Sequence, residues 1–405
     1  MLKISMTILI IVLVVLAVAG FVFRQQIGRG LYQRSLFSGA EQHHHFVRQS
    51  QYFPIATLSA SDEPHIFPAA SSIGLPADFL YEGERVSTEA FLVETDTAAL
   101  LVLRDGELIY ENYWLTGGRD VKWLAHSVSK SFVSAAVGLA LRDGLISTIE
   151  DPISDYVPAL KGSGYDGVRI KDVLQMSSGI RWTEAYADPK SDINRFGWTM
   201  FMGHSYNEFV ASMVRENEPG TFNRYTGMDT QALAMLVTAV TEKSLAAYLE
   251  DNLWHPMGME SDAYWTTDNE GTALALGGFN ATARDYAKLG ELYRRQGEWN
   301  GVQILPADWV RASVTPDAPH LVPGENDLSS HSMGYGYQWW LLEGGRGDYS
   351  AIGIYNQFIY VNPEHSMVIV KLSANRRYAQ DSSPSSYREA ETFELFREIA
   401  VRLQE

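Results

Sequence analysis

The sequence of 405 residues contains no cysteine. This absence excludes a thiol nucleophile, disulfide bonds, iron–sulfur clusters and zinc sites with cysteine ligands. Basic residues are also scarce, because 32 lysines and arginines stand against 49 aspartates and glutamates, for a formal net charge of −17. So acidic a chain repels phosphate backbones, and we expect no nucleic-acid partner. The length is enough for one large domain or two smaller ones that bury a full core.

Several familiar functional motifs are missing or out of context. The chain has no G-x-S-x-G, no H-E-x-x-H and no Walker P-loop. Residues Gly162–Gly167 match G-x-G-x-x-G, but the preceding Asp151-Pro152 and Tyr156-Val157-Pro158 do not form a strand pattern. A dinucleotide site needs that strand, so we interpret these glycines as a flexible loop.

A long uncharged run opens the chain, from Ile4 to Phe23. Twenty helical residues extend for about 30 Å, the thickness of the hydrocarbon core of a bilayer. Residues 1–24 therefore fit either a transmembrane anchor or a secretory signal cleaved near Ala17-Val18-Ala19. We favour the anchor, because the apolar run continues to Arg24. The basic residues lie on both sides of the run and leave its orientation open: Lys3, then Arg24, Arg29 and Arg34.

Residues 25–85 are expected to form a juxtamembrane tether before a folded body over 86–405. The tether is rich in proline and serine between residues 50 and 85, which is typical of an irregular segment on the surface. It also contains His43-His44-His45, which suggests a metal site. Three consecutive side chains cannot share one helix face, and no carboxylate pattern accompanies them. We therefore favour an exposed polar stretch and expect no metal site.

The body shows strand patterns at both ends of a mainly helical stretch. Ala98–Leu103 and Leu108–Trp114 flank Asp105-Gly106, which predicts a hairpin. Strand patterns return at Tyr335–Leu342, Ser350–Val361 and Met367–Ser373, followed by a helix over Tyr387–Leu403. Helices are expected at Ile170–Met176, Tyr206–Arg215, Asp229–Val240 and Leu245–Leu253. The order predicts an α+β fold with a helical subdomain over about 150–270.

Ser127 and Lys130 carry the chemistry that the sequence suggests. They open an expected helix over Ser127–Arg142 that is almost entirely apolar. Residues at i and i+3 share a helix face, so the hydroxyl and the amine lie within hydrogen-bonding reach. A serine hydroxyl needs a neighbour to take its proton, and burial among apolar residues would lower the pKa of a lysine enough to do so. The pattern alone is weak, because about one S-x-x-K is expected by chance in a chain of this composition.

Further segments strengthen that pattern. They are Trp123–Phe132 (WLAHSVSKSF), Asp143–Ile146 (DGLI), Leu174–Gly179 (LQMSSG), Pro219-Gly220-Thr221 with Tyr225, Leu253–Met259 (LWHPMGM) and Gly277–Asp285 (GGFNATARD). In this order, over roughly residues 90–400, the chain resembles the SxxK serine hydrolases, which include class C β-lactamases, D,D-peptidases and related esterases. Glu184-Ala185-Tyr186 and Ala351–Tyr355 make it most similar to the 6-aminohexanoate-dimer hydrolase branch. The resemblance implies a β-lactamase/transpeptidase-like fold, with an antiparallel sheet flanked by helices and a helical subdomain.

The resemblance also implies residue roles. Ser127 would be the acylated nucleophile, Lys130 its base and Tyr225 the proton carrier to the leaving group. The backbone N–H groups of Ser127 and Ile354 would form the oxyanion hole. Substrate-binding candidates are Tyr186, Asn280, Gly353 and Tyr355, with Trp198 and Trp339 as further possible walls of the cleft. No cofactor is implied.

Two motifs depart from the family pattern. The Tyr-x-Asn motif reads Tyr225-Thr226-Gly227, so its asparagine is missing. The Lys-Thr-Gly motif aligns with Ala351-Ile352-Gly353, so the lysine that helps bind the carboxylate of penicillins and peptides is absent. We therefore expect hydrolysis of amides or esters that lack that carboxylate or bind it elsewhere. A β-lactamase, D,D-peptidase or esterase of the same fold and a non-catalytic penicillin-binding sensor stay as alternatives.

The expected location is a bacterial-type inner membrane, with the body periplasmic or extracellular and a small-molecule amide or ester as partner. The location rests on the resemblance, since the flanking charges do not decide it. The sequence leaves the natural substrate, the fate of the N-terminal segment, the deacylation base and the oligomeric state open.

Overall fold

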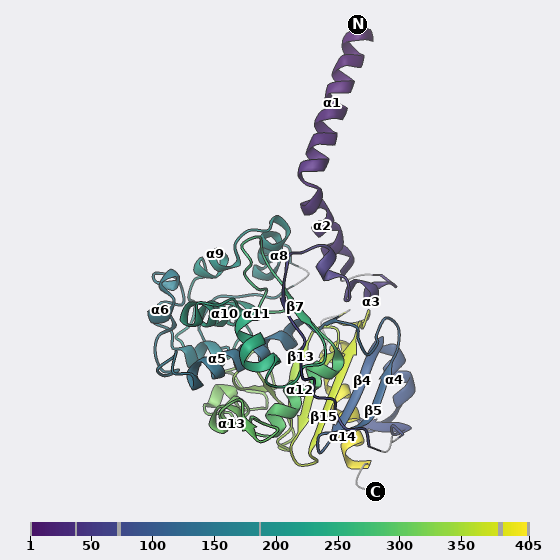
Figure 1. Ribbon diagram of the computed structural model, residues 1–405, viewed down its shortest axis with the longest axis vertical. Helices are drawn as coiled ribbons and strands as arrows, with labels where there is room; N and C mark the ends of the chain where they lie inside the picture. Colours follow the sequence, from purple (N-terminus) through teal and green to yellow (C-terminus); the bar gives the residue numbers. More distant parts are fainter. Residues whose placement is uncertain (1, 37–38, 71–73, 186–187, 380–383, 403–405) are drawn as a thin grey trace.

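The long N-terminal helix projects away from a compact catalytic body in the computed structural model, which describes residues 2–36, 39–70, 74–185, 188–379 and 384–402 (Figure 1). Helix α1 (Leu2–Val22) forms the projection, and α2 (Arg24–Leu36) leads back to the body. No single helix in the described part of the chain meets the length and hydropathy requirements for crossing a membrane. Ile8–Val18 is a shorter apolar stretch. The helical segments Gly227–Thr241 and Leu245–Trp254, which are bent by 73° relative to each other, meet the requirements only when they are taken together. The expected anchor therefore stays a prediction.

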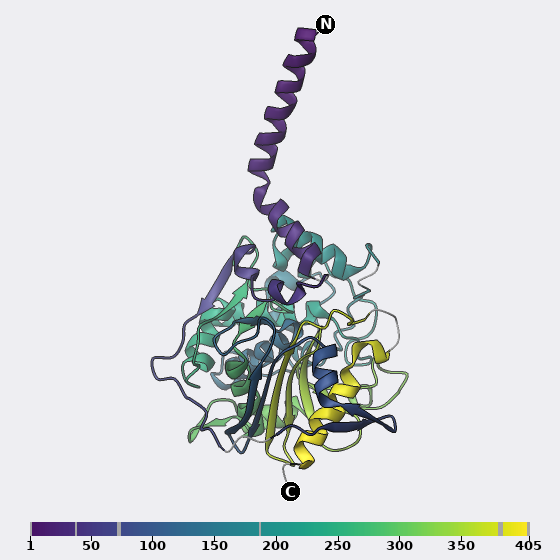
Figure 2. The same ribbon diagram turned by 90° about the vertical axis from the view of Figure 1, so that its right-hand side faces the viewer.

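A seven-stranded antiparallel sheet is the centre of the body (Figure 2). Its strands, in spatial order, are β11 (Gly334–Tyr335), β12 (Trp340–Leu341), β13 (Tyr349–Gly353), β14 (Gln357–Asn362), β15 (Met367–Ser373), β4 (Thr97–Arg104) and β5 (Glu107–Tyr113). Seven of the eight residues of β4 are buried, which explains its continuous apolar run. The expected hairpin is confirmed, with Asp105 and Gly106 both at positive φ in the turn.

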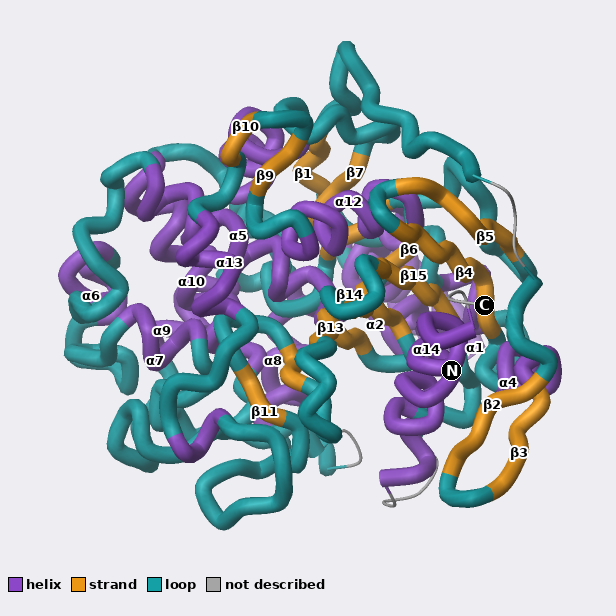
Figure 3. The backbone as a smooth tube through the Cα atoms, turned by 90° about the horizontal axis from the view of Figure 1, so that it is seen from below, coloured by secondary structure: helices purple, strands orange, loops and turns teal. Residues whose placement is uncertain are grey.

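Helices cover both faces of this sheet (Figures 2 and 3). On one face lie α5 (Ser129–Arg142) and α12 (Ala283–Arg294). On the other face lie α4 (Thr88–Glu94) and the C-terminal α14 (Glu389–Arg402), which packs Phe393 and Phe396 against Phe358. The α+β fold with a flanked antiparallel sheet is therefore confirmed.

Most of the expected helices are present, with different bounds. The helical part contains α6 (Ile153–Tyr156), α7 (Ile170–Leu174), α8 (Asp192–Met202), α9 (Tyr206–Ala211), α10 (Gly227–Thr241), α11 (Leu245–Leu249) and a π-helical turn η4 (Glu250–Trp254). Tyr335–Leu342, expected as one strand, instead forms the two short strands β11 and β12. The remaining short elements are β9 (Glu298–Trp299), β10 (Val302–Gln303), α13 (Ala307–Ser313) and the 3-10 turns η1 (Gln49–Gln51), η3 (Pro158–Leu160), η5 (Pro319–Leu321) and η6 (Pro384–Tyr387).

The segment expected as a tether packs onto the body. Its strand β1 (Ile55–Leu58) joins β7 (Ala263–Thr266), β8 (Phe279–Ala281) and β6 (Trp123–Leu124) in a four-stranded sheet, and β2 (Asp78–Tyr81) pairs with β3 (Glu84–Ser87). Tyr32 and Phe46, the latter just after α3 (Gln42–His45), are fully buried in the main core. Residues 25–85 therefore contribute packed structure to the body.

Candidate active site

Ser127 lies at a sharp corner between the small sheet and the central helix. Strand β6 ends at Leu124, the 3-10 turn η2 (His126–Val128) follows, and α5 begins at Ser129. His126 takes a φ of 47°, which is unusual for a residue with a side chain. The half-buried Ser127 therefore stands in the 3-10 turn directly before α5, at the positive end of the helix dipole, which stabilises negative charge.

Lys130 lies beside the Ser127 hydroxyl and is shielded from water. Its side chain is only 2% exposed, and its Nζ lies 3.0 Å from Ser127 Oγ and 2.5 Å from the carbonyl oxygen of Leu276. Burial lowers the pKa of the lysine to about 8, while the charge of Glu184 acts in the opposite direction. A substantial fraction of this amine is therefore neutral near pH 8 and able to accept the hydroxyl proton.

Tyr225 completes the group of proton-carrying side chains. Lys130 Nζ lies 5.0 Å from the centroid of its ring, and the ring stacks on Trp340 at 5.2 Å. Burial raises the pKa of the Tyr225 phenol well above its ordinary value, the charge of Glu184 raises it further, and a hydrogen bond with Ser127 lowers it. The phenol therefore stays protonated at neutral pH. It is suited to donate a proton to a leaving group, and not to act as a base in the phenolate form.

The expected oxyanion strand approaches the nucleophile closely. A Cβ added to Gly353, the last residue of β13, would lie 2.3 Å from the carbonyl oxygen of Ala125, so a side chain does not fit there. Ile354 follows directly, and the described hydrogen bonds contain no backbone acceptor for its N–H. Tyr355 is half-buried at a φ of 66°, with its ring 5.7 Å from that of His126. Gly353, Ile354 and Tyr355 thus lie beside the Ser127 turn.

Other candidates from the sequence lie elsewhere. Tyr186 falls outside the described residues. Asn280 is fully buried on β8, where its amide donates to Gln49 and to the carbonyl of Gly278, so its contacts are those of a packed residue and not of a cleft wall. Trp339 is also fully buried, with its ring 4.5 Å from that of Tyr293. Trp198 is instead exposed on α8.

The motif contains a second serine with a different environment. Ser129 is fully buried, donates to the carbonyl of His126 and accepts from the N–H of Phe279, so it ties α5 to β8. A second serine–lysine pair also exists, since Lys371 Nζ donates to Ser373 Oγ at 2.5 Å on β15. Both residues are fully buried, and burial lowers the pKa of Lys371 to about 7. Of these two pairs, the Ser127 pair is the one that combines a perturbed amine with a half-buried hydroxyl that solvent reaches.

Sequence reasoning missed the role of Glu184. Its Oε1 accepts from Trp182 Nε1 at 2.9 Å, and its charge raises the pKa of both Lys130 and Tyr225. In the sequence, Glu184 stands out only as part of the tripeptide Glu184-Ala185-Tyr186 that resembles the family. Nothing in the local pattern connects it with Lys130, which lies 54 positions earlier.

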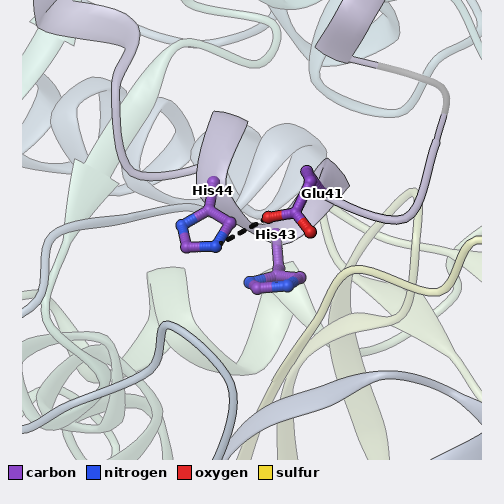
Figure 4. A group of neighbouring side chains, drawn as sticks. All are labelled: Glu41, His43 and His44. Carbon is purple, nitrogen blue, oxygen red and sulfur yellow. Dashed lines mark ion pairs between the residues drawn. The ribbon is translucent and has the colours of Figure 1, made fainter.

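Among the residues that the structure describes, two groups of side chains have the composition of a metal site. Glu41, His43 and His44 offer ligand atoms within 4.8 Å of one another (Figure 4), as do Glu250, Asp251 and His255. In the first group His44 pairs with Glu41 at 2.9 Å, and His43 Nδ1 lies 3.1 Å from Thr116 Oγ1. The structure thus brings a carboxylate to the histidine run, contrary to the expectation that none accompanies it. In this group Glu41 is exposed, and His43 and His44 are half-buried.

Comparison with known proteins decides the family. Residues 88–392 match the Beta-lactamase family. The chain belongs to the β-lactamase family. It is 32% identical over 342 residues to the 6-aminohexanoate-dimer hydrolase of Paenarthrobacter ureafaciens, covering 81% of this chain and 84% of that protein. This β-lactamase-family protein is therefore a serine hydrolase, homologous to a 6-aminohexanoate-dimer hydrolase.

Solved structures agree on the fold of this family member. A Bacillus anthracis protein described as a proposed 6-aminohexanoate-dimer hydrolase superposes with a TM-score of 0.81 at 23% identity, over 91% of this chain and 96% of that one. A D-stereospecific amidohydrolase from Streptomyces superposes with a TM-score of 0.54 at 17% identity, over 73% and 93% of the two chains. At these identities the likeness concerns the fold alone.

Proposed function

We propose that this serine hydrolase cleaves linear amides or esters through an acyl-enzyme at Ser127. Ser127 Oγ attacks the carbonyl carbon while its proton passes to the neutral Lys130 amine. The N–H groups of Ser127 and Ile354 stabilise the oxyanion. The bond from carbon to the leaving nitrogen or oxygen then breaks, and the leaving group takes a proton through Tyr225. A water molecule hydrolyses the acyl group and regenerates the hydroxyl.

One observation carries the proposal: a lysine that is 2% exposed, with a pKa lowered to about 8, stands 3.0 Å from a half-buried serine hydroxyl. Hydroxyl, amine and phenol supply the required proton transfers themselves, so the proposal needs no metal or organic cofactor. Tyr355, Gly353 and Trp340 border the reacting groups and are the proposed substrate contacts in the described part of the chain.

The substrate class follows from what the third motif lacks. With Ala351 in place of the family's lysine, the edge of β13 offers no side-chain cation for a substrate carboxylate. This absence favours simple esters, or linear amides whose carboxylate lies far from the scissile bond as in amides of 6-aminohexanoate, over penicillins and acyl-D-alanyl peptides, whose carboxylate lies next to it.

Turnover of three compounds by the full chain tests this choice: a linear aminohexanoate amide, a short-chain ester and a chromogenic cephalosporin. We expect release from the amide or the ester, and none from Ser127→Ala. Efficient cephalosporin turnover alone would instead favour a β-lactamase. A stable adduct without turnover would favour a sensor.

The N-terminal segment leads to a second part of the proposal. We propose that α1 anchors the enzyme to a bacterial-type inner membrane, with the body periplasmic or extracellular. The uncharged run from Ile4 to Phe23 supports this, and so do the exposed apolar side chains of α1, such as Leu16 at 61%. Resistance of the full chain to carbonate extraction, with the body open to external protease in spheroplasts, is the expected result. Extraction into the soluble fraction would contradict the anchor.

A further inference from the structure

Helix α2 presents one face to the body and an apolar face to solvent. Arg29, Tyr32 and Leu36 point inward and are buried. Ile27 and Leu31, one helical turn apart, point outward with 48% and 67% of their surfaces exposed. The inward arginine is held by Asn269 and by the carbonyl of Tyr52, so the helix is fixed in this rotation. Helix α2 therefore carries apolar side chains on its outer face as well as on its inner face, whereas the apolar residues of a surface helix usually face only the core.

Helix α8 extends this exposed apolar surface. The two helices touch, since Gln33 Nε2 lies 3.4 Å from the carbonyl of Gly197 and a Cβ on Gly30 would lie 2.6 Å from the Phe201 ring. Beside these contacts Trp198 is 61% exposed, with its ring 4.9 Å from that of Phe201. Figure 1 shows α2 and α8 at the end of the body from which α1 projects. We call this surface, formed by Phe23, Ile27, Leu31 and Trp198, the α2–α8 face.

The charge of the neighbouring chain indicates the occupant of this face. The first 40 residues contain four basic residues and no acidic one, whereas the remainder has 28 basic against 49 acidic residues. Arg24 and Arg34 are exposed on α2, and the apolar helix α1 continues from it. An acidic body with a locally basic, apolar and tryptophan-bearing face suits an anionic surface that is apolar beneath, as in a lipid bilayer.

We propose that the α2–α8 face lies on the surface of an anionic phospholipid bilayer, with Trp198 in the interfacial layer. This surface is distinct from α1, and its contact with lipid does not depend on whether α1 crosses the bilayer. The docked segment also leads to the active site. Tyr32 donates to the carbonyl of His45, and the next residue, Phe46, packs its ring 5.0 Å from His126 and 5.6 Å from Tyr355. Docking would therefore hold the catalytic site in one orientation close to the lipid.

Tryptophan fluorescence offers a direct test, because Trp198 is the exposed member of ten tryptophans, all of which are described. The full chain is mixed with phosphatidylglycerol vesicles whose acyl chains are brominated near the headgroup. We expect quenching of the wild type and loss of most of that quenching in Trp198→Phe. Leu31→Glu should reduce the quenching at least severalfold, whereas Leu80→Glu, at a site 58% exposed on β2 and outside the face, should not.

Three results would overturn the proposal. Equal quenching in the wild type and Trp198→Phe would show that Trp198 does not meet lipid. Cosedimentation with vesicles without quenching of Trp198 would show attachment through α1 alone. A fluorescence change that needs no lipid and grows with protein concentration would show that a second copy covers the face. None of these readouts depends on hydrolysis, so the proposed catalytic function would be unaffected.

Discussion

The pH dependence of acylation should follow the Lys130 amine. Burial lowers the pKa of this amine from 10.5 to about 8. At pH 7 about one amine in ten is then neutral, against about one in 3,000 for an unperturbed lysine, which is roughly a 300-fold gain in competent enzyme. The acylation rate should therefore rise about tenfold per pH unit below pH 7 and level off above about pH 8.

Rapid-mixing measurement of Ser127 modification by a fluorophosphonate, from pH 5.5 to 10, reports this step without deacylation. Lys130→Arg keeps a positive charge that does not titrate in this range, and should lower the plateau about 10²–10⁴-fold and remove the inflection. An inflection near pH 6.5 would refute the reasoning, since burial lowers the pKa of the adjacent His126 to about 3 and removes it as a candidate. Full activity of Lys130→Arg would refute it as well.

Further predictions concern the surroundings of this pair. Glu184→Gln, which keeps an acceptor for Trp182, should shift the inflection of the acylation profile to lower pH, because the Glu184 charge raises the pKa of Lys130; an unchanged profile would exclude this coupling. Gly353→Ala should lower kcat about 10²–10³-fold in steady-state assays, since its Cβ would lie 2.3 Å from the carbonyl oxygen of Ala125, whereas Gly74→Ala, at a site with open space around it, should not. Lys371 has a folded pKa of about 7, below its unfolded value near 10.5, so the unfolded state binds more protons between these pH values and stability should rise with pH across that window. In urea unfolding, Lys371→Met should reduce this rise in the free energy of unfolding by up to about 1.4 kcal/mol per pH unit, and it should leave the acylation profile unchanged. An unaltered rise would contradict the claim that burying the protonated Lys371 amine destabilises the folded state.

The central helix and the main sheet could be predicted from the sequence, because the apolar patterns of their residues match the extent to which they are buried. Helix α5 is apolar on nearly every side, and it is almost completely buried. Strand β4 is a continuous apolar run and lies between two helical layers. The hairpin turn needs positive φ at Asp105 and Gly106, and an Asp-Gly pair in the sequence is typical of such a turn.

Helix α12 was not predicted, because its buried face is charged. Arg284 pairs with Glu111 of β5 at 2.6 Å, and Lys288 lies 3.3 Å from Asp285 of the same helix, in which nearly all residues are buried. Apolar periodicity, the main signal for a helix, is lost when ion pairs occupy the buried positions. Glu111, and Glu260 at 3.5 Å from Lys288, come from segments distant in the sequence, so a local pattern does not show them.

The site was predicted in part for the same reason. Ser127 and Lys130 are neighbours on one turn, and their contact follows from helix geometry. The Glu184 contribution, the burial of Asn280 and the docking of α2 all depend on contacts between segments far apart in the sequence. The resemblance implied only that Tyr225 carries a proton to the leaving group. Burial raises the pKa of its phenol, which favours proton donation.

The most direct test is the location of a covalent adduct. Intact-mass analysis of the full chain with a fluorophosphonate, followed by peptide mapping, should show one adduct on Ser127. The adduct should disappear in Ser127→Ala and persist in Ser373→Ala, whose hydroxyl also lies beside a lysine but is fully buried. Labelling that survives Ser127→Ala, or a wild-type chain that stays unmodified, would contradict nucleophilic catalysis by Ser127.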